Sequence, residues 1–229
     1  MKIITNQKLI ARNRRIGQYL TVGSLLVLGG GLYLSFNNEL INWSMVALLG
    51  GFIMSQAGIY FGSRWGRSPR PDERVSEALK GLGDQYTLYH YNSPVPHLLI
   101  GPAGIWVLMH FSQGGEISYD DKKGRWKQKG GNLYLKIFAQ EGLGRPELDV
   151  AAAITDLEKF LQKKTGSHEV GVIDCALVFS NEKATIQSQE TPYPALPIRK
   201  LKDLIRRKAK QSPIPPDLLA RVHEILPQD

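Results

Sequence analysis

Two long runs without charge lie near the start of this 229-residue chain, and they constrain its fold more than any other feature. Residues 16–36 form a run of 21 uncharged residues, and residues 41–62 form a second run of 22. As an α-helix, each run would be about 30 Å long, which matches the hydrocarbon core of a bilayer. Only Asn37-Asn38-Glu39-Leu40 separates the two runs. The sequence therefore predicts an antiparallel transmembrane hairpin.

A secretory signal peptide is the alternative interpretation of the first run. The apolar region of a signal peptide is only about 7–15 residues long and ends at a cleavage site of small residues. The first run here is longer, and a second run follows it at once. The hairpin is therefore the better interpretation of residues 16–62.

The charges that flank the two runs predict the orientation of the hairpin. Residues 1–15 carry five bases and no acid, and the link between the runs carries no base. Four arginines follow the second run, at positions 64, 67, 70 and 74. Because basic flanks stay in the cytoplasm, we expect a two-pass protein of the cell (inner) membrane with both termini cytoplasmic. Much of the formal charge of +8 then reflects membrane topology.

Small residues recur along one face of the second run. They are Ala47, Gly51, Ser55, Gly58 and Gly62. Such a stripe lets another helix backbone approach closely. Two interpretations remain open, namely packing against the first helix or a seam between copies in a homo-oligomer. Neither run contains a charged residue or a histidine, so a path for ions or protons is not expected.

The whole chain divides by its patterns into four segments. Residues 1–15 form a basic cytoplasmic tail, 16–62 the hairpin (helices 16–36 and 41–62), 63–74 a linker and 75–229 one cytosolic domain. A single cysteine, Cys175, excludes an intramolecular disulfide. It lies in an apolar run, where a buried and inert thiol is typical.

Hydrophobic spacing in the cytosolic part predicts alternating strands and helices. Aromatic and branched residues predict strands at 86–91, 97–100, 104–109, 116–119, 132–138 and 171–179. Apolar positions at helical spacing predict helices at 73–82, 147–164, 198–209 and 217–226. The turn Gly101-Pro102-Ala103-Gly104 predicts an antiparallel hairpin between two strands. The expected fold class is α/β (α+β), with a central mixed sheet flanked by helices.

The run from Val95 to Phe111, VPHLLIGPAGIWVLMHF, carries a family resemblance. It resembles, without a gap, the Ile-Asp-His-Leu-Val-Val-Gly-Pro-x-Gly-Ile-Phe-Val-Ile-Glu-x-Lys pattern of the NERD (nuclease-related) domain of bacteria. The helix that opens the family's domain resembles Asp72 to Leu79, and later family positions resemble Gly114-Gly115 and Trp126. The resemblance covers roughly residues 72–226 and implies a restriction-endonuclease-like domain.

The departures from the family pattern fall on its catalytic positions. In the family, the Asp and the Glu-x-Lys supply metal ligands and an activating lysine. Here these positions are Pro96, Met109 and Phe111, and only Glu73 resembles a surviving ligand. Hydrolysis by this route needs Mg²⁺, which takes hard oxygen ligands that these three side chains do not offer. We therefore expect a catalytically inactive domain without metal or cofactor. A metal-dependent nuclease with displaced ligands is the alternative.

Two basic clusters in the cytosolic part are candidate binding residues. One comprises Lys122, Lys123, Arg125, Trp126, Lys127 and Lys129, and the other includes Arg206, Arg207 and Lys208. Such clusters suit nucleic-acid phosphates, with the tryptophan stacking on a base, or anionic lipid headgroups. A solvated surface without a partner is the third interpretation. The expected function is a membrane-anchored binding or regulatory module at the cytoplasmic membrane face, and a purely structural, oligomerising membrane protein is a further alternative.

Overall fold

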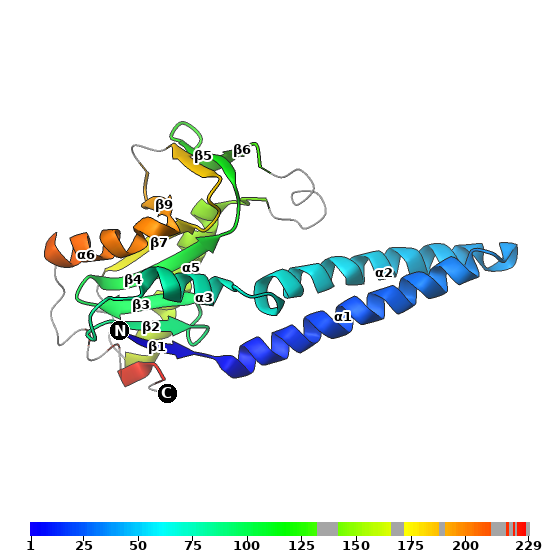
Figure 1. The fold of residues 1–229 in the computed structure, drawn as a ribbon, viewed down its shortest axis with the longest axis horizontal. Coiled ribbons are helices and arrows are strands. Elements are labelled where there is room, and N and C mark those ends of the chain that lie inside the picture. Colours follow the sequence, from blue (N-terminus) through cyan, green and yellow to red (C-terminus); the bar gives the residue numbers. More distant parts are fainter. Residues whose placement is uncertain are drawn as a thin grey trace. The chain divides into compact units, whose positions relative to one another are not determined.

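A computed structural model of the chain describes residues 1–131, 142–165, 172–187 and 191–211, together with 219, 222 and 224–227 (Figure 1). The chain forms two compact units. The first, called the helix pair below, comprises Gln7–Arg70. The second, called the sheet unit, combines Met1–Asn6 with the described residues from Pro71 onward. Because the sheet unit contains segments from both sides of the helix pair, the helix pair is an insertion between two parts of one folded domain.

The helix pair consists of α1 (Gln7–Leu34) and α2 (Ile41–Phe61), joined by a short 3-10 turn at Asn38–Leu40. The two apolar runs are thus confirmed as helices. The helices run antiparallel, because Gly17 of α1 lies against Phe61 and Thr21 of α1 lies against Gly58. The first helix begins at Gln7 and not near residue 16, since the lysine and arginines before residue 16 are good helix formers.

Small residues fill the contact between α1 and α2. Gly51 lies against Leu28, Gly58 lies against Thr21, and the Ser44 hydroxyl donates a hydrogen bond to the Gly31 carbonyl at 2.7 Å. The glycines of the stripe at positions 51 and 58 are therefore committed to the contact with α1. Large apolar side chains point outward instead, among them Leu25, Leu26, Val46 and Leu49. Both helices are long and apolar enough to cross a membrane.

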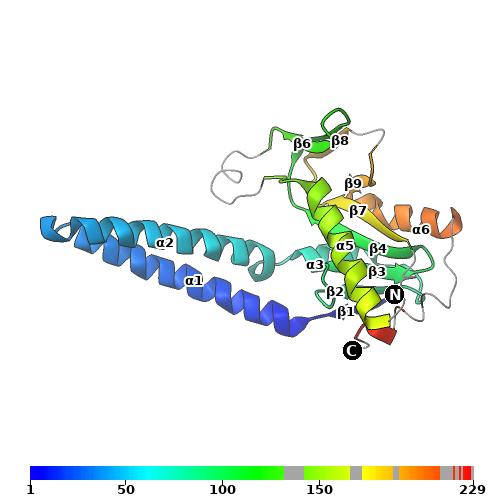
Figure 2. The same cartoon turned by 180° about the vertical axis from the view of Figure 1, so that it is seen from behind.

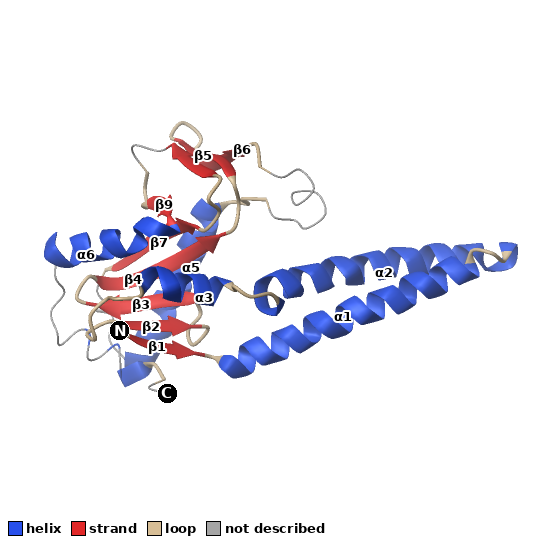
Figure 3. Cartoon of the chain, viewed as in Figure 1, coloured by secondary structure: helices blue, strands red, loops and turns tan. Residues whose placement is uncertain are grey.

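The sheet unit is built on a six-stranded mixed sheet with the order β1-β2-β3-β4-β7-β9 (Figure 3). Its strands are β1 (Lys2–Thr5), β2 (Thr87–His90), β3 (His97–Gly101), β4 (Gly104–Phe111), β7 (Ile173–Phe179) and β9 (Ala195–Pro197). The predicted hairpin is confirmed: β3 and β4 pair antiparallel around a tight turn, in which Gly104 has a φ of 114°. Strands β4 and β7 pair in parallel at the centre.

Helices cover both faces of this sheet, as Figures 1 and 2 show from opposite sides. On one face, α3 (Pro71–Leu79) and α6 (Leu201–Gln211) pack over a core that includes Leu88, Trp106 and Val178. On the other face, α5 (Pro146–Thr165) packs over a core that includes Leu98 and Cys175. The mixed α/β class expected from the sequence is confirmed.

Strand β1 replaces part of the expected basic tail. Residues 1–15 form this strand and the first turns of α1. The strand pairs in parallel with β2, from Lys2 opposite Thr87 to Thr5 opposite His90. Its Ile4 side chain lies in the core beneath α5. The N-terminal residues are therefore an edge of the sheet and not a tail.

A second, three-stranded sheet has the order β6-β5-β8. It comprises β5 (Gly115–Asp120), β6 (Arg125–Lys129) and β8 (Ala184–Gln187), of which only β5 was expected from the sequence. The expected strand at 132–138 lies outside the described residues, as do five of the ten residues of the expected helix at 217–226.

Candidate functional site

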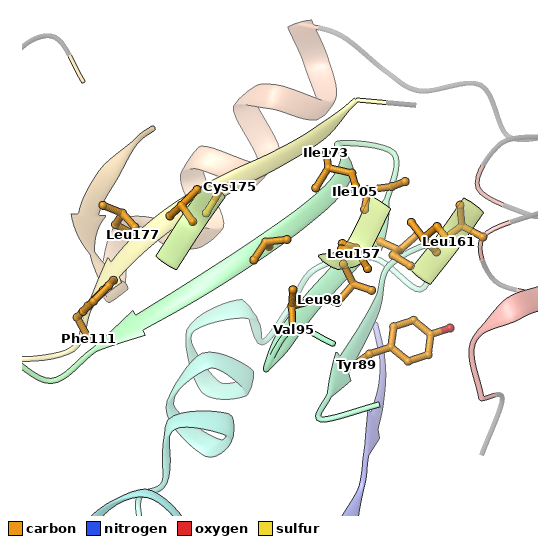
Figure 4. Packing of buried hydrophobic residues seen from close by; sticks show 14 of the residues in the cluster. Tyr89, Val95, Leu98, Ile105, Phe111, Leu157, Leu161, Ile173, Cys175 and Leu177 are labelled. Carbon is orange, nitrogen blue, oxygen red and sulfur yellow. The ribbon is translucent and has the colours of Figure 1, made fainter. Parts of the chain in front are cut away.

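The three positions that bear catalytic groups in the nuclease-related family carry apolar side chains in the sheet unit. Met109 packs against the core beneath α5, and Phe111 is only 9% exposed. The Phe111 ring stacks on Phe179, with ring centroids 5.2 Å apart, and Figure 4 shows it within the packed cluster. Pro96 precedes β3, and its carbonyl accepts a hydrogen bond from the Tyr91 amide. The end of β4 is therefore packed as hydrophobic core.

Glu73, the suggested remnant of the site, lies on α3. This helix packs through Val75 and Leu79 on the face of the sheet that carries Trp106. Met109 and Phe111 contribute to the opposite face. The helix that carries Glu73 therefore covers the opposite face of the sheet from these two positions. Within the ranges that the structure describes, no three His, Cys, Asp or Glu side chains are grouped so that they could hold a metal ion.

A buried histidine pair is the main polar feature that the sequence did not reveal. His90 on β2 lies directly opposite His97 on β3, and the two Nδ1 atoms are 2.8 Å apart. The Nε2 atom of His90 lies 2.8 Å from the Ser76 hydroxyl of α3. Both rings are at most 2% exposed. A single proton has to lie between the two Nδ1 atoms, so the tautomer of one ring fixes that of the other.

His90 also joins the two segments through which the sheet unit is connected to the helix pair. Its carbonyl accepts a hydrogen bond from the amide of Asn6, the residue just before α1. Its ring contacts Ser76 of α3, the first helix of the sheet unit after α2. These contacts of His90 lie inside the sheet unit and connect Asn6 with Ser76. They hold two chain segments that are 70 residues apart in sequence.

The first basic cluster lies on the hairpin formed by β5 and β6. Lys122 and Lys123 are exposed in the turn, and Arg125, Lys127 and Lys129 are exposed on the edge strand β6. Lys127 forms an ion pair with Asp120 and lowers the pKa of that carboxyl group. Exposed charges on an edge strand also oppose pairing with another chain.

Trp126 lies within the same cluster but is not presented to solvent. Its side chain is 4% exposed, and its ring packs on Tyr119 at a centroid distance of 5.3 Å. It belongs to the core that lies beneath α5. A nucleic-acid base could not stack on this ring without rearrangement of the hairpin. Only the cations of this cluster are therefore available to a ligand.

The second basic cluster, on α6, is partly occupied by contacts within the sheet unit. Arg206 donates a hydrogen bond to the Gly81 carbonyl at 3.0 Å, and Lys202 donates one to the Lys80 carbonyl at 3.0 Å. These bonds satisfy carbonyls just after the end of α3. Burial raises the pKa of Asp174, and the charge of Lys208 opposes that rise. Arg207 is exposed.

The thiol of Cys175 is not a reactive group in this fold. The side chain is 2% exposed on the central strand β7. Burial, followed by the neighbouring charge of Asp174, raises the pKa of Cys175 to about 12. Because the thiolate is the nucleophilic form, the thiol stays protonated and inert near neutral pH.

Among the described candidate residues of the sheet unit, those accessible to a ligand are therefore exposed cations, a residue type that suits anions. Its histidines at positions 90 and 97 are buried and hydrogen-bonded to each other. No protein-family model, curated protein or solved structure matches this chain.

Proposed function

We propose that the chain is a membrane-anchored, nuclease-related (NERD-like) protein that has lost catalysis and acts as a binding or regulatory module at the cytoplasmic face. The observation that carries this proposal is the packing at the end of β4. The two positions that would bear the Glu-x-Lys carry Met109, which packs against the core, and Phe111, which is buried in it and stacks on Phe179. A phosphodiesterase metal site needs carboxylate oxygens and open coordination positions there.

The membrane anchor is supported by the side chains on the outside of the helix pair. Small residues face inward and large apolar residues face outward, which is the arrangement expected for helices surrounded by lipid. The two helices also have the length and the apolar composition needed to span a bilayer.

The connection of the helix pair to the sheet unit favours a hairpin that crosses the membrane twice and not a chain that crosses it once. Strand β1 directly precedes α1, and α3 follows α2, yet both belong to one folded unit. The start of α1 and the end of α2 must then lie on the same side of the membrane. The flanking bases assign that side to the cytoplasm.

A topology reporter tests the anchor. We expect a reporter that is active only in the cytoplasm to be active when fused after Asp229 and inactive when inserted between Asn37 and Asn38. The reason is that the short link has no base to retain it in the cytoplasm. Activity at both positions would mean that the helix pair does not cross the membrane, and the reverse pattern would mean an inverted orientation.

A cleavage assay tests the loss of catalysis. We expect the purified full chain in detergent to leave single- and double-stranded DNA and RNA intact with Mg²⁺ or Mn²⁺, because no ligand oxygens occupy positions 96, 109 and 111. The Glu73→Ala variant serves as the control for a contaminating nuclease. Cleavage by the wild type that disappears in this variant would establish a displaced active site and refute the proposal.

A further inference from the structure

Cations are concentrated at one end of the helix pair. Within Gln7–Arg70 the chain carries seven lysine and arginine residues and a single acid, Glu39. Glu39 lies in the link between the helices, whereas all seven bases lie before residue 16 or after residue 63. Because the helices are antiparallel, both groups of bases belong to the end of the pair opposite Glu39. No acid of the helix pair lies at that end.

Three of these cations share the outer face of α1. Lys8, Arg12 and Arg15 are spaced by four and three residues, which aligns them along one side of a helix. All three are exposed, while Ile10, Asn13 and Gly17 make up the buried side of the same turns. None of the three forms an ion pair with any residue in the described ranges.

A further cation, Arg64, is held in place at the end of α2. The chain continues there in a π-helical turn at Gly62–Gly66. The Arg64 guanidinium lies 5.4 Å from the centroid of the Trp65 ring and donates a hydrogen bond to the Tyr60 hydroxyl at 3.3 Å. Both partners are neutral, so they orient the guanidinium without compensating its charge.

Two exposed tyrosines mark a common depth on the helices. Gly17 meets Phe61 and Thr21 meets Gly58, so Tyr19 and Tyr60 lie at matching levels along the pair. Both rings are exposed. Amphipathic rings in this position sit at the headgroup level of a bilayer. Arg15 and Arg64 each lie four residues, about one helical turn, beyond these rings toward the basic end.

We infer that the basic end of the helix pair, comprising Lys8, Arg12, Arg15 and Arg64, binds the phosphate of anionic phospholipid headgroups. The depth of the tyrosines places Arg15 and Arg64 beside the phosphates of one leaflet, with Arg12 and Lys8 about one and two helical turns beyond Arg15. A guanidinium offers paired donors that match a phosphate, and the helix pair itself contributes no acid to this end. This inference rests on the proposed membrane insertion, and it concerns residues distinct from the basic clusters of the sheet unit.

Lipid retention by the full chain tests this inference. The chain is reconstituted into nanodiscs of equal parts phosphatidylcholine and phosphatidylglycerol and released into mild detergent, and retained lipids are counted by native mass spectrometry. We expect wild type to retain phosphatidylglycerol preferentially. In the R12Q/R15Q/R64Q variant the ratio of the two retained lipids should fall at least fivefold, because one cation near an anionic surface strengthens binding by roughly fivefold and this variant lacks three of them.

Matched variants separate this site from general electrostatics. The K159Q/K163Q/K164Q variant removes three exposed cations from α5 of the sheet unit, outside both basic clusters, and should keep the wild-type ratio. Arg64→Gln alone should lower the ratio, and Arg64→Lys should restore part of it. Equal retention of both lipids by wild type, or an equal loss in the sheet-unit variant, would overturn the inference. Failure of wild type to enter the nanodiscs would instead refute the proposed membrane anchor.

Discussion

Leucine in place of Gly58 is expected to force α1 and α2 apart. A Cβ atom at this position would lie 2.7 Å from the Thr21 hydroxyl oxygen and 3.1 Å from the Thr21 backbone nitrogen. The hydroxyl cannot turn away freely, since it donates a hydrogen bond to the Gly17 carbonyl at 2.8 Å. The backbone cannot move without the whole helix. We expect a loss of about 3 kcal/mol in the stability of the helix pair, at the upper end of overpacking costs.

The measurement is the thermal stability of the full chain in detergent, followed by size-exclusion chromatography with fluorescence detection. Gly50→Leu is the matched control, because a Cβ atom at Gly50 would have no neighbour within 4 Å. It should leave the melting temperature unchanged. A larger loss for Gly50→Leu than for Gly58→Leu would contradict this packing and would point to a contact between copies on the outer face of α2.

Aspartate in place of Ile4 is expected to remove β1 from the sheet. Ile4 is 6% exposed and packs in the core beneath α5. A carboxylate there has no cation to pair with in a core of apolar side chains, and a buried unpaired charge typically costs about 3–5 kcal/mol. With a urea dependence of roughly 2 kcal/mol per molar, the unfolding midpoint should fall by about 2 M.

Urea unfolding of the full chain in detergent measures this effect through tryptophan fluorescence, since Trp106 and Trp126 are buried in the sheet unit. Ile3→Asp is the control. Ile3 is the neighbouring residue of the same strand, it is 46% exposed, and its side chain alternates to the other face. Its variant should shift the midpoint by less than about 0.5 M. A midpoint for Ile4→Asp equal to that of wild type would mean that β1 does not contribute to the sheet.

The sequence predicts the elements whose signal is local. Charge-free runs identify α1 and α2, and branched and aromatic residues identify β2, β3, β4 and β7. Strand β1 escapes prediction because its four residues, KIIT, have no periodicity of their own and pair with a strand more than 80 residues away. Strand β6, RWKQK, escapes because an edge strand needs few apolar residues, and here Trp126 alone anchors it.

The contacts of the candidate site depend on register, which the sequence does not contain. His90 and His97 are seven residues apart, and only the pairing of β2 with β3 places them opposite each other. Likewise, spacing alone does not reveal that Trp126 points into the core or that Arg206 binds the Gly81 carbonyl. The apolar residues at positions 96, 109 and 111 are visible in the sequence, because they need only a residue type and not a geometry.

The place of β1 in the sheet has a consequence for the order of events during synthesis. This strand leaves the ribosome first, but its partner β2 begins 82 residues after Thr5, and the helix pair lies between them. At about 5–20 residues per second, β1 waits roughly 4–16 s for its partner. In the proposed topology, both helices enter the bilayer during this interval. A chain in which only one of the two helices crosses the bilayer leaves β1 on the opposite side from β2, so the completed sheet itself would act as a check on insertion of both helices.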